Sequence, residues 1–225
     1  MKTRIFALLM ILTLAGTVTF AQSSDKSKMS FGILGGVNFQ NLNGKDASGD
    51  KLTNEMILGY HAGLNVQIPI APQFYFQPGL MYSTKGAKES SGSVTSTVRI
   101  SYIELPLNLV YKAELGSGYF MLGFGPYIGY GVSGKEKNEG GTLSVNRDVK
   151  FKNVVEMSDP ITFAYYKALD LGGNIFAGFQ LGNGIFAQLD TQLGMVKINP
   201  ENKGNSNDKT SVKNTGFGLS LGFRF

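Results

Sequence analysis

Apolar and polar residues alternate strictly along the last eleven positions of the chain. A period of two over this length predicts a β-strand with two different faces. One face is apolar almost throughout and the other is small or charged, which predicts lipid on one side and the lumen of a closed barrel on the other. The first face carries Thr215, Phe217, Leu219, Leu221, Phe223 and Phe225, and the second carries Gly216, Gly218, Ser220, Gly222 and Arg224.

The same division recurs in seven earlier segments, so the sequence predicts eight strands. Each segment is close to the roughly 9–11 residues that a tilted strand needs to cross a bilayer. The segments lie near residues 31–40, 58–70, 74–83, 102–111, 120–131, 170–181 and 185–193. We therefore expect an all-β fold, an eight-stranded antiparallel up-and-down transmembrane β-barrel.

The connections between these segments alternate in length. Residues 71–73, 113–117 and 182–184 form short turns rich in Gly, Pro and Asn, whereas residues 42–56, 84–98, 134–168 and 198–213 form long polar loops. Bacterial barrels have short periplasmic turns and longer extracellular loops, and an even strand number places both termini in the periplasm. A soluble β-sandwich has no reason to sort its loops in this way.

Outward-facing aromatic residues gather near both ends of the predicted strands. Two such girdles are typical of the two membrane interfaces. We place Phe31, Phe74, Phe76, Tyr111, Phe120, Phe179, Phe223 and Phe225 at the periplasmic ends, and Phe39, Tyr60, Tyr82, Tyr130 and Phe217 towards the extracellular ends.

The first residues have the three-part pattern of a secretory signal. Lys2 and Arg4 precede an apolar run over residues 5–14, and small residues lead to Ala21. A membrane-anchoring helix would need roughly 20 apolar residues, and this run is interrupted. We expect a cleaved signal peptide at 1–21, a short N-terminal periplasmic segment at 22–29 and an outer-membrane β-barrel at 30–225.

Composition and charge narrow the functional classes. The chain has 30 Gly, 16 Phe, 10 Tyr and no Cys, so it has no disulfide framework and no cysteine acceptor for a lipid anchor. Removing the signal peptide lowers the net charge from +5 to +3, since 19 Lys and Arg then face 16 Asp and Glu. This small, scattered excess excludes nucleic acid as a partner.

Several strings are similar to those of the PorT-like outer-membrane β-barrel family. They are the opening Gly32 to Gly36 followed by Asn38, the string from Gln77 to Leu80 with Tyr82 to Gly86, and the string from Tyr102 to Leu107. The resemblance covers about Phe31 to Phe225. It implies a link to protein secretion, although most members are uncharacterised. The terminal Phe225 also resembles the signal that the barrel-assembly machinery recognises during biogenesis.

The lumen of an eight-stranded barrel is just wide enough for side chains to fill, so we expect no open pore. Buried charges there must be paired or solvated. We expect Arg224 to pair with Glu104 or Asp190, and a proton or ion path through the network is the alternative. The candidate site is this polar network, which contains His61, Gln77, Glu104, Asn108, Gln188, Asp190 and Arg224.

No motif for catalysis, cofactor binding or metal binding is present. His61 is the only histidine, and a rim hydrolase would have to combine it with Ser83 or Ser101 and a carboxylate. Asp46, Asp50 and Glu55 lack the regular spacing of a calcium loop.

The leading hypothesis is a non-enzymatic protein of the Gram-negative cell outer membrane. Its long loops would bind an envelope or secretion protein, and outer-membrane lipid and lipopolysaccharide would surround it. The alternatives are a lipid A or protein hydrolase acting at the rim, and a narrow channel.

Overall fold

The structure, a computed structural model, describes residues 28–140, 143–205 and 207–225. The expected signal peptide at 1–21 and most of the segment at 22–29 lie outside these residues. Over the described residues the regular structure is β throughout. None of them belongs to a helix long and apolar enough to cross a membrane.

Eight of the strands in the described residues close into an antiparallel ring. The ring follows the order β4-β3-β2-β1-β12-β10-β9-β5, and pairing of β4 with β5 joins its two ends. The eight-stranded up-and-down barrel expected from the sequence is therefore confirmed. Its strands are β1 (Ser30–Lys45), β2 (Ile57–Ala71), β3 (Phe74–Ser91), β4 (Val94–Leu115), β5 (Gly118–Gly140), β9 (Leu169–Leu181), β10 (Ile185–Gly194) and β12 (Ser211–Arg224).

Four shorter strands lie outside the ring. They are β6 (Leu143–Phe151), β7 (Val154–Val155), β8 (Ala164–Tyr166) and β11 (Glu201–Asn202). β6 pairs with β5 and with β8, and β7 pairs with β11. All four occur within two of the long connections, residues 141–168 and 195–210, so these connections are partly ordered into β structure.

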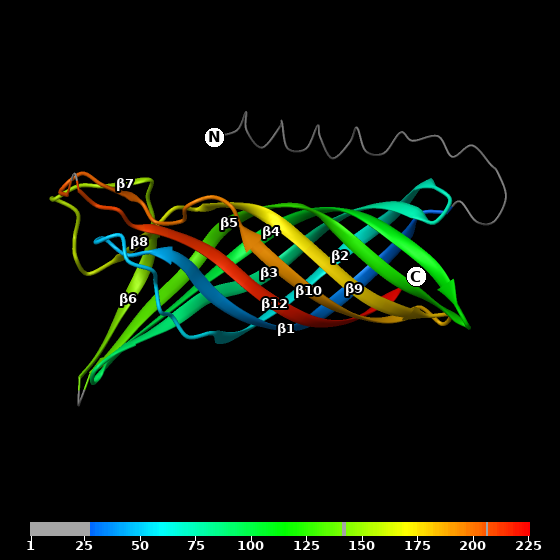
Figure 1. Cartoon of the computed structure of the whole chain (residues 1–225), viewed down its shortest axis with the longest axis horizontal. Helices are drawn as coiled ribbons and strands as arrows, with labels where there is room; N and C mark the ends of the chain where they lie inside the picture. Colours follow the sequence, from blue (N-terminus) through cyan, green and yellow to red (C-terminus); the bar gives the residue numbers. More distant parts are fainter. Residues whose placement is uncertain (1–27, 141–142, 206) are drawn as a thin grey trace, which may run out of the picture.

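The two ends of the barrel differ, as Figure 1 shows. The C-terminus and the turns after β2, β4 and β9 gather at one end, which we call the turn end. The segments that carry β6, β7 and β8 gather at the other, which we call the loop end. This sorting follows from the up-and-down order, because each strand reverses the direction of the one before it.

Apolar side chains cover the outside of the ring. Leu105, Leu219 and Leu221 are 41%, 46% and 64% exposed on the protein surface. Along the same strands the alternate positions point inwards, and Glu104 and Ser220 are 1% exposed. A surface of this kind is stable only against hydrocarbon, because exposed apolar patches of such extent are rare on soluble monomers.

Aromatic rings pair across neighbouring strands at both ends of the apolar band. At the loop end Phe39 stacks on Phe217 with ring centroids 5.1 Å apart, and Tyr60 lies 6.0 Å from Tyr82. At the turn end the centroids of Phe74 and Tyr111 are 5.2 Å apart. These pairs lie where the sequence predicted the two interfacial girdles.

The expected loop at 84–98 is wrong. β3 and β4 continue through it as 18- and 22-residue strands joined by a turn at residues 92–93. Gly92 adopts φ +58°, which a residue without Cβ allows at no steric cost. The stretch from Val94 to Val98 is rich in β-branched residues, which favour strand over loop. The same correction applies to 134–168, since β5 continues to Gly140.

The extended strands form an arm beyond the barrel. Pairing of β2 with β3 ends at Ser83, and pairing of β5 with β9 ends at Tyr130. Beyond these points β3, β4, β5 and β6 pair only among themselves and with β8, apart from one isolated bridge. We call residues 86–100, 134–140 and 143–148 the arm, and it projects at the lower left of Figure 1.

An apolar cluster closes the inside of the loop end. Ile100 and Ile198 are fully buried in it, which ties the arm to the segment after β10. The cluster comprises Leu42, Ala87, Val98, Ile100, Tyr102, Val149, Ala164 and Ile198. This packing fixes the base of the arm on the barrel.

We expect Leu219→Arg to lower the free energy of unfolding from lipid vesicles by about 2–4 kcal/mol, because it places a charge near the middle of the hydrocarbon layer. Urea titration read by heat-modifiable gel mobility measures the change. Thr215→Arg, on the same strand face but beyond Phe217, is the control and should cost about 0–1 kcal/mol. Equal effects would contradict a lipid-facing wall.

Candidate functional site

Lys85 occupies the centre of a buried ion cluster in the loop-end half of the lumen. Its Nζ lies 2.7 Å from Oε1 of Glu104 on β4 and 3.0 Å from Oδ2 of Asp170 on β9. The three side chains are at most 1% exposed. Because a buried charge is costly unless it is paired, each of these groups depends on the others.

Tyr127 completes the cluster from β5. Its hydroxyl donates to Oδ2 of Asp170 at 3.1 Å, and Nζ of Lys85 lies 4.2 Å from its ring centroid. The tyrosine can lie there because residue 172 on β9 is glycine, where a Cβ would come within 2.6 Å of the ring. The ammonium thus gains a cation–π contact in addition to its two carboxylates.

Amides from β10 and β12 add further contacts to the two carboxylates. Nδ2 of Asn214 donates to Oδ2 of Asp170 at 2.9 Å, and Nε2 of Gln192 donates to Oε2 of Glu104 at 3.0 Å. We call Lys85, Glu104, Asp170, Tyr127, Asn214 and Gln192 the ion plug. Since these six residues come from six different strands, the plug joins most of the ring across its interior.

A cavity of about 50 Å³ lies between the ion plug and the turn end. Since a water needs roughly 10–15 Å³ of such volume, the cavity has room for about three to five waters, which is far less than an open pore. Nδ2 of Asn174 donates to Oδ1 of Asn108 across it at 2.6 Å. Six of the seven residues of the candidate network line it, namely His61, Gln77, Glu104, Asn108, Gln188 and Asp190.

His61 is held by a serine on β12. Its Nε2 lies 2.7 Å from Oγ of Ser220, and that hydroxyl is 3.3 Å from Oδ1 of Asp190. In a catalytic triad the histidine stands between the nucleophile and the carboxylate. Here the serine stands between them inside the lumen, so the three groups form a structural chain of polar contacts.

The two serines expected beside His61 in a hydrolase have other partners. Oγ of Ser83 accepts from Nδ2 of Asn38 at 3.2 Å. Oγ of Ser101 accepts from the hydroxyl of Tyr82 at 2.8 Å. Ser83 is the cross-strand partner of His61, but Asn38 holds its hydroxyl and Tyr82 holds that of Ser101, so the structure does not assemble the expected hydrolase site.

Lys112 is a central cation in the turn-end half of the lumen. Its Nζ donates to Oε1 of Gln180 at 3.0 Å and to Oε1 of Gln67 at 3.3 Å. The ammonium also lies 4.9 Å from the ring centroid of Tyr119 and 5.4 Å from that of Tyr75. Amide oxygens and ring faces take the place of a carboxylate here.

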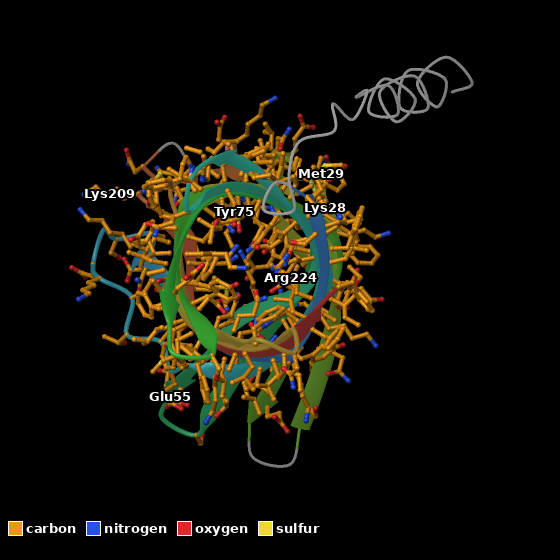
Figure 2. All side chains as sticks on the ribbon, turned by 90° about the vertical axis from the view of Figure 1, so that its right-hand side faces the viewer. Lys28, Met29, Glu55, Tyr75, Lys209 and Arg224 are labelled. Carbon is orange, nitrogen blue, oxygen red and sulfur yellow. The ribbon has the colours of Figure 1, made fainter. Side chains whose placement is uncertain are left out.

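Arg224 lies in the same layer and points into the ring in the end-on view of Figure 2. Its Nη2 donates to Oδ1 of Asn65 at 3.0 Å and to Oε1 of Gln77 at 3.4 Å. The expected ion pair with Glu104 or Asp190 is wrong. Glu104 forms its ion pair with Lys85, and Asp190 accepts a hydrogen bond from Ser220, which contacts His61. The closest partners of Arg224 are amides.

Three charged residues of the lumen were missing from the candidate network. Lys85 lay in the expected loop, and continuing the alternation beyond Ser83 would have assigned it to the inner face. Lys112 follows Asn108 on inward positions of β4, and Asp170 is the second residue of β9. The period of two would have identified all three.

The first long loop shows no cation site. Oδ1 of Asp46 accepts the backbone N–H groups of Ser48, Gly49 and Asp50, each at 2.9 Å. Glu55 forms an ion pair with Lys88 at 3.1 Å. Within the residues that the structure describes, no three or more acidic or histidine side chains are grouped to hold a metal.

We expect Lys85→Met to lower the free energy of unfolding by about 3–5 kcal/mol, because it leaves Glu104 and Asp170 buried without their cation. Urea titration in lipid vesicles measures the loss. Restoring neutrality with Glu104→Gln and Asp170→Asn in the same chain should recover most of it.

The matched control is Lys88→Met, which removes the exposed ion pair with Glu55. An exposed pair contributes only about 0–1 kcal/mol, so this variant should unfold almost like the wild type. If the two lysine variants are equally stable, the ion plug does not organise the lumen.

Comparison with solved structures finds the attachment invasion locus protein Ail of Yersinia pestis. In complex with the heparin analogue sucrose octasulfate it is 14% identical, with a TM-score of 0.41, and in another crystal structure it is 13% identical, with a TM-score of 0.39. Each alignment covers 88% of this chain and 99% of that protein. No curated protein sequence matches this chain.

The family model described as outer membrane protein beta-barrel domain matches residues 20–199 of the 225. This match spans most of the chain and includes seven of the eight ring strands in full. It agrees with the apolar outer wall, the closed ring and the sorted connections. The chain belongs to the outer membrane β-barrel domain family, and it is an integral protein of the outer membrane.

Proposed function

We propose that the protein is non-enzymatic and binds a partner at the cell surface with its arm and neighbouring loops. The observation that carries this proposal is the contrast between the two ends of β3, β4 and β5. Within the barrel they supply Lys85, Glu104 and Tyr127, half of the ion plug that blocks the lumen. Beyond the barrel the same strands continue as the arm, which serves no purpose in closing the ring.

The plugged lumen argues against the channel hypothesis. The cavity below the plug is about 50 Å³, and charged or amide side chains occupy the layers on both sides of it. Eight-stranded barrels of this size fill their interior with side chains. The barrel thus serves as a rigid platform for what it carries outside.

The hydrolase hypothesis has no support at the loop end. His61 lies in the lumen against Ser220, and it is only 6% exposed. A rim enzyme needs a nucleophile and a base that an outside substrate can reach. We propose that His61 and Asp190 serve packing of the lumen.

The surface offered to a partner combines the arm with the segment between β6 and β8. Val145 on β6 is 56% exposed, and Met157 and Ile161 are 86% and 88% exposed. Lys152 holds the base of this segment by donating to both carboxylate oxygens of Asp159 at 2.6 Å. Exposed apolar residues on a braced segment suit recognition of a protein.

The PorT-like resemblance indicates which kind of partner the protein binds. It supports a role as an accessory of protein secretion, with an envelope or secretion protein as the partner. The proposal also includes contact of the outer wall with outer-membrane lipid and lipopolysaccharide, and recognition of Phe225 by the barrel-assembly machinery. The turn end then faces the periplasm and the loop end faces the cell exterior.

We expect trimming of the arm to abolish partner binding while the barrel stays folded. Residues 137–146 are replaced by Asn-Gly, which joins the paired residues Glu136 and Arg147 by a tight hairpin turn. A photo-crosslinking residue at Met157 reports the partner on intact cells, and the amount of protein secreted by a complemented deletion strain reports the function.

The control is the same crosslinker at Ile185, at the turn end of β10, which should capture nothing from the cell exterior. Heat-modifiable mobility must be retained by the trimmed chain. Normal crosslinking and normal secretion with the trimmed arm would contradict the proposal.

The segment between β6 and β8 should loosen at acidic pH. The backbone N–H of Glu156 and then the ammonium of Lys152 hold the pKa of Asp159 below its ordinary value of 3.8. A depressed pKa gives a contribution that is complete above the ordinary pKa and is lost as the pH falls through the depressed value. Hydrogen-exchange protection of the Glu156 amide at pH 6 and pH 3 measures this, with Asp159→Asn expected to be weakly protected at both.

Planar-bilayer recording tests the closed lumen directly. We expect the wild type to show no steady single-channel steps, because the plug spans the interior. A variant with Lys85, Glu104 and Asp170 all changed to Ala should also stay closed, because the apolar cluster of the loop end and the layer around Lys112 still fill the lumen. Steady steps from the wild type would favour the channel hypothesis instead.

A further inference from the structure

A hollow of about 460 Å³ lies on the outer surface at the base of the arm. It is formed where β4 and β5 leave the ring and β6 pairs with β5, and its exposed residues Arg99, Val132 and Lys135 face the surroundings of the barrel. Its lining includes Arg99, Ser101, Val132, Ser133, Lys135 and Asp148. Val149 also lines the hollow and is shared with the apolar cluster of the loop end, whereas none of the lining residues belongs to the ion plug.

The hollow begins where the loop-end aromatic girdle ends. Tyr82 of the girdle donates from its hydroxyl to Oγ of Ser101, which lines the hollow. On the neighbouring strand Tyr130 is 61% exposed, and Val132, which follows two residues later, is 49% exposed. The membrane-side wall is therefore apolar, and the hollow lies at the level of lipid headgroups.

Two cations stand side by side in this hollow. Arg99 on β4 and Lys135 on β5 are direct cross-strand partners, and both are exposed. Like charges directly opposite each other on a sheet are destabilising. Such a pair is stable when an anion lies between the two groups.

The protein itself supplies little neutralising charge. Asp148 is the cross-strand partner of Lys135 on β6, but in the part of the chain that the structure describes neither Arg99 nor Lys135 has a carboxylate within ion-pair distance. Nη1 of Arg99 donates to the backbone carbonyl of Leu58 at 2.7 Å, which fixes the guanidinium against the barrel wall.

Other cations of the arm differ in this respect. Lys88 pairs with Glu55 at 3.1 Å, and Lys137 pairs with Glu139 at 2.7 Å. The arm therefore neutralises the lysines further from the membrane and leaves the two cations nearest to it for another anion.

We propose that this hollow binds a phosphate group of a glycolipid of the outer leaflet, the phosphorylated lipid A portion of lipopolysaccharide. The guanidinium of Arg99 binds phosphate in a forked geometry, Lys135 adds a second charge, and the hydroxyl of Ser133 is a further donor. Val132 packs against the first carbons of the lipid. Basic pockets at membrane level bind anionic headgroups in this way.

This inference deepens the lipid contact included in the proposed function, but it does not depend on partner binding by the arm. Trimming residues 137–146 leaves Arg99, Lys135 and Asp148 in place. Loss of partner binding with lipid binding intact, or the reverse, would separate the two proposals.

The test is a titration of the refolded barrel in detergent micelles with fluorescent lipid A. We expect bis-phosphorylated lipid A to bind more tightly than the dephosphorylated lipid with the same acyl chains. Arg99→Gln with Lys135→Gln should weaken binding about 25-fold, from about a fivefold loss for each cation. Lys137→Gln, on the same strand face but already paired, is the matched control and should bind like the wild type.

Three outcomes would overturn the proposal: equal binding of the two lipids, undiminished binding by the double variant, or displacement of the lipid by inorganic phosphate at equal concentration, which would indicate a site for a soluble anion. If the double variant does not show the heat-modifiable mobility of a folded barrel, Arg99→Gln and Lys135→Gln are titrated singly. Each should lose about fivefold, and no loss in either would overturn the proposal.

Discussion

Closure of the ring by pairing β4 with β5 is the constraint on which the rest of the structure depends. In hydrocarbon an unpaired backbone N–H or C=O has no water to bind, so a sheet can span the membrane only without free edges. The β4–β5 pairing runs from Val94 to Leu115 along β4. Once the ring is closed, every second side chain points into a narrow lumen, and these side chains must find partners there.

The charges of the side chains that point into the lumen cancel one another in number. The described side chains that enter the ring include three cations and three carboxylates. They are Lys85, Lys112, Arg224, Glu104, Asp170 and Asp190. The three carboxylates lie in the plug and beside the central cavity, and two of the cations lie nearer the turn end. Amides and aromatic rings stabilise those two cations, which explains how a barrel without disulfides keeps a charged interior.

The alternation of residue types was enough to predict the eight strands, the inward and outward faces and the two girdles. The alternation did not predict the extension of β3 beyond Ser83. Directly beyond Ser83 the polar residues Thr84 and Lys85 are both buried, at 2% and 1% exposed, so no apolar–polar alternation marks the strand there and the sequence predicts a loop that contains Lys85. The partner of Arg224 could not be predicted either, because contacts across a lumen depend on register and stagger, and neither is encoded in the period of two.

The long strands have a membrane-spanning half and a half in the arm, and the different roles of these halves follow from the constraints above. Inside the membrane a strand has little freedom, because one face must suit lipid and the other must fit the plug. From Lys135 on β5 onwards neither condition holds, and the strand pairs with β4 and β6 alone. The base of the arm, held by Ile100 and Ile198 in the apolar cluster, transfers the rigidity of the barrel to residues outside the membrane. Recognition can therefore change on the arm without disturbing the ring that holds it.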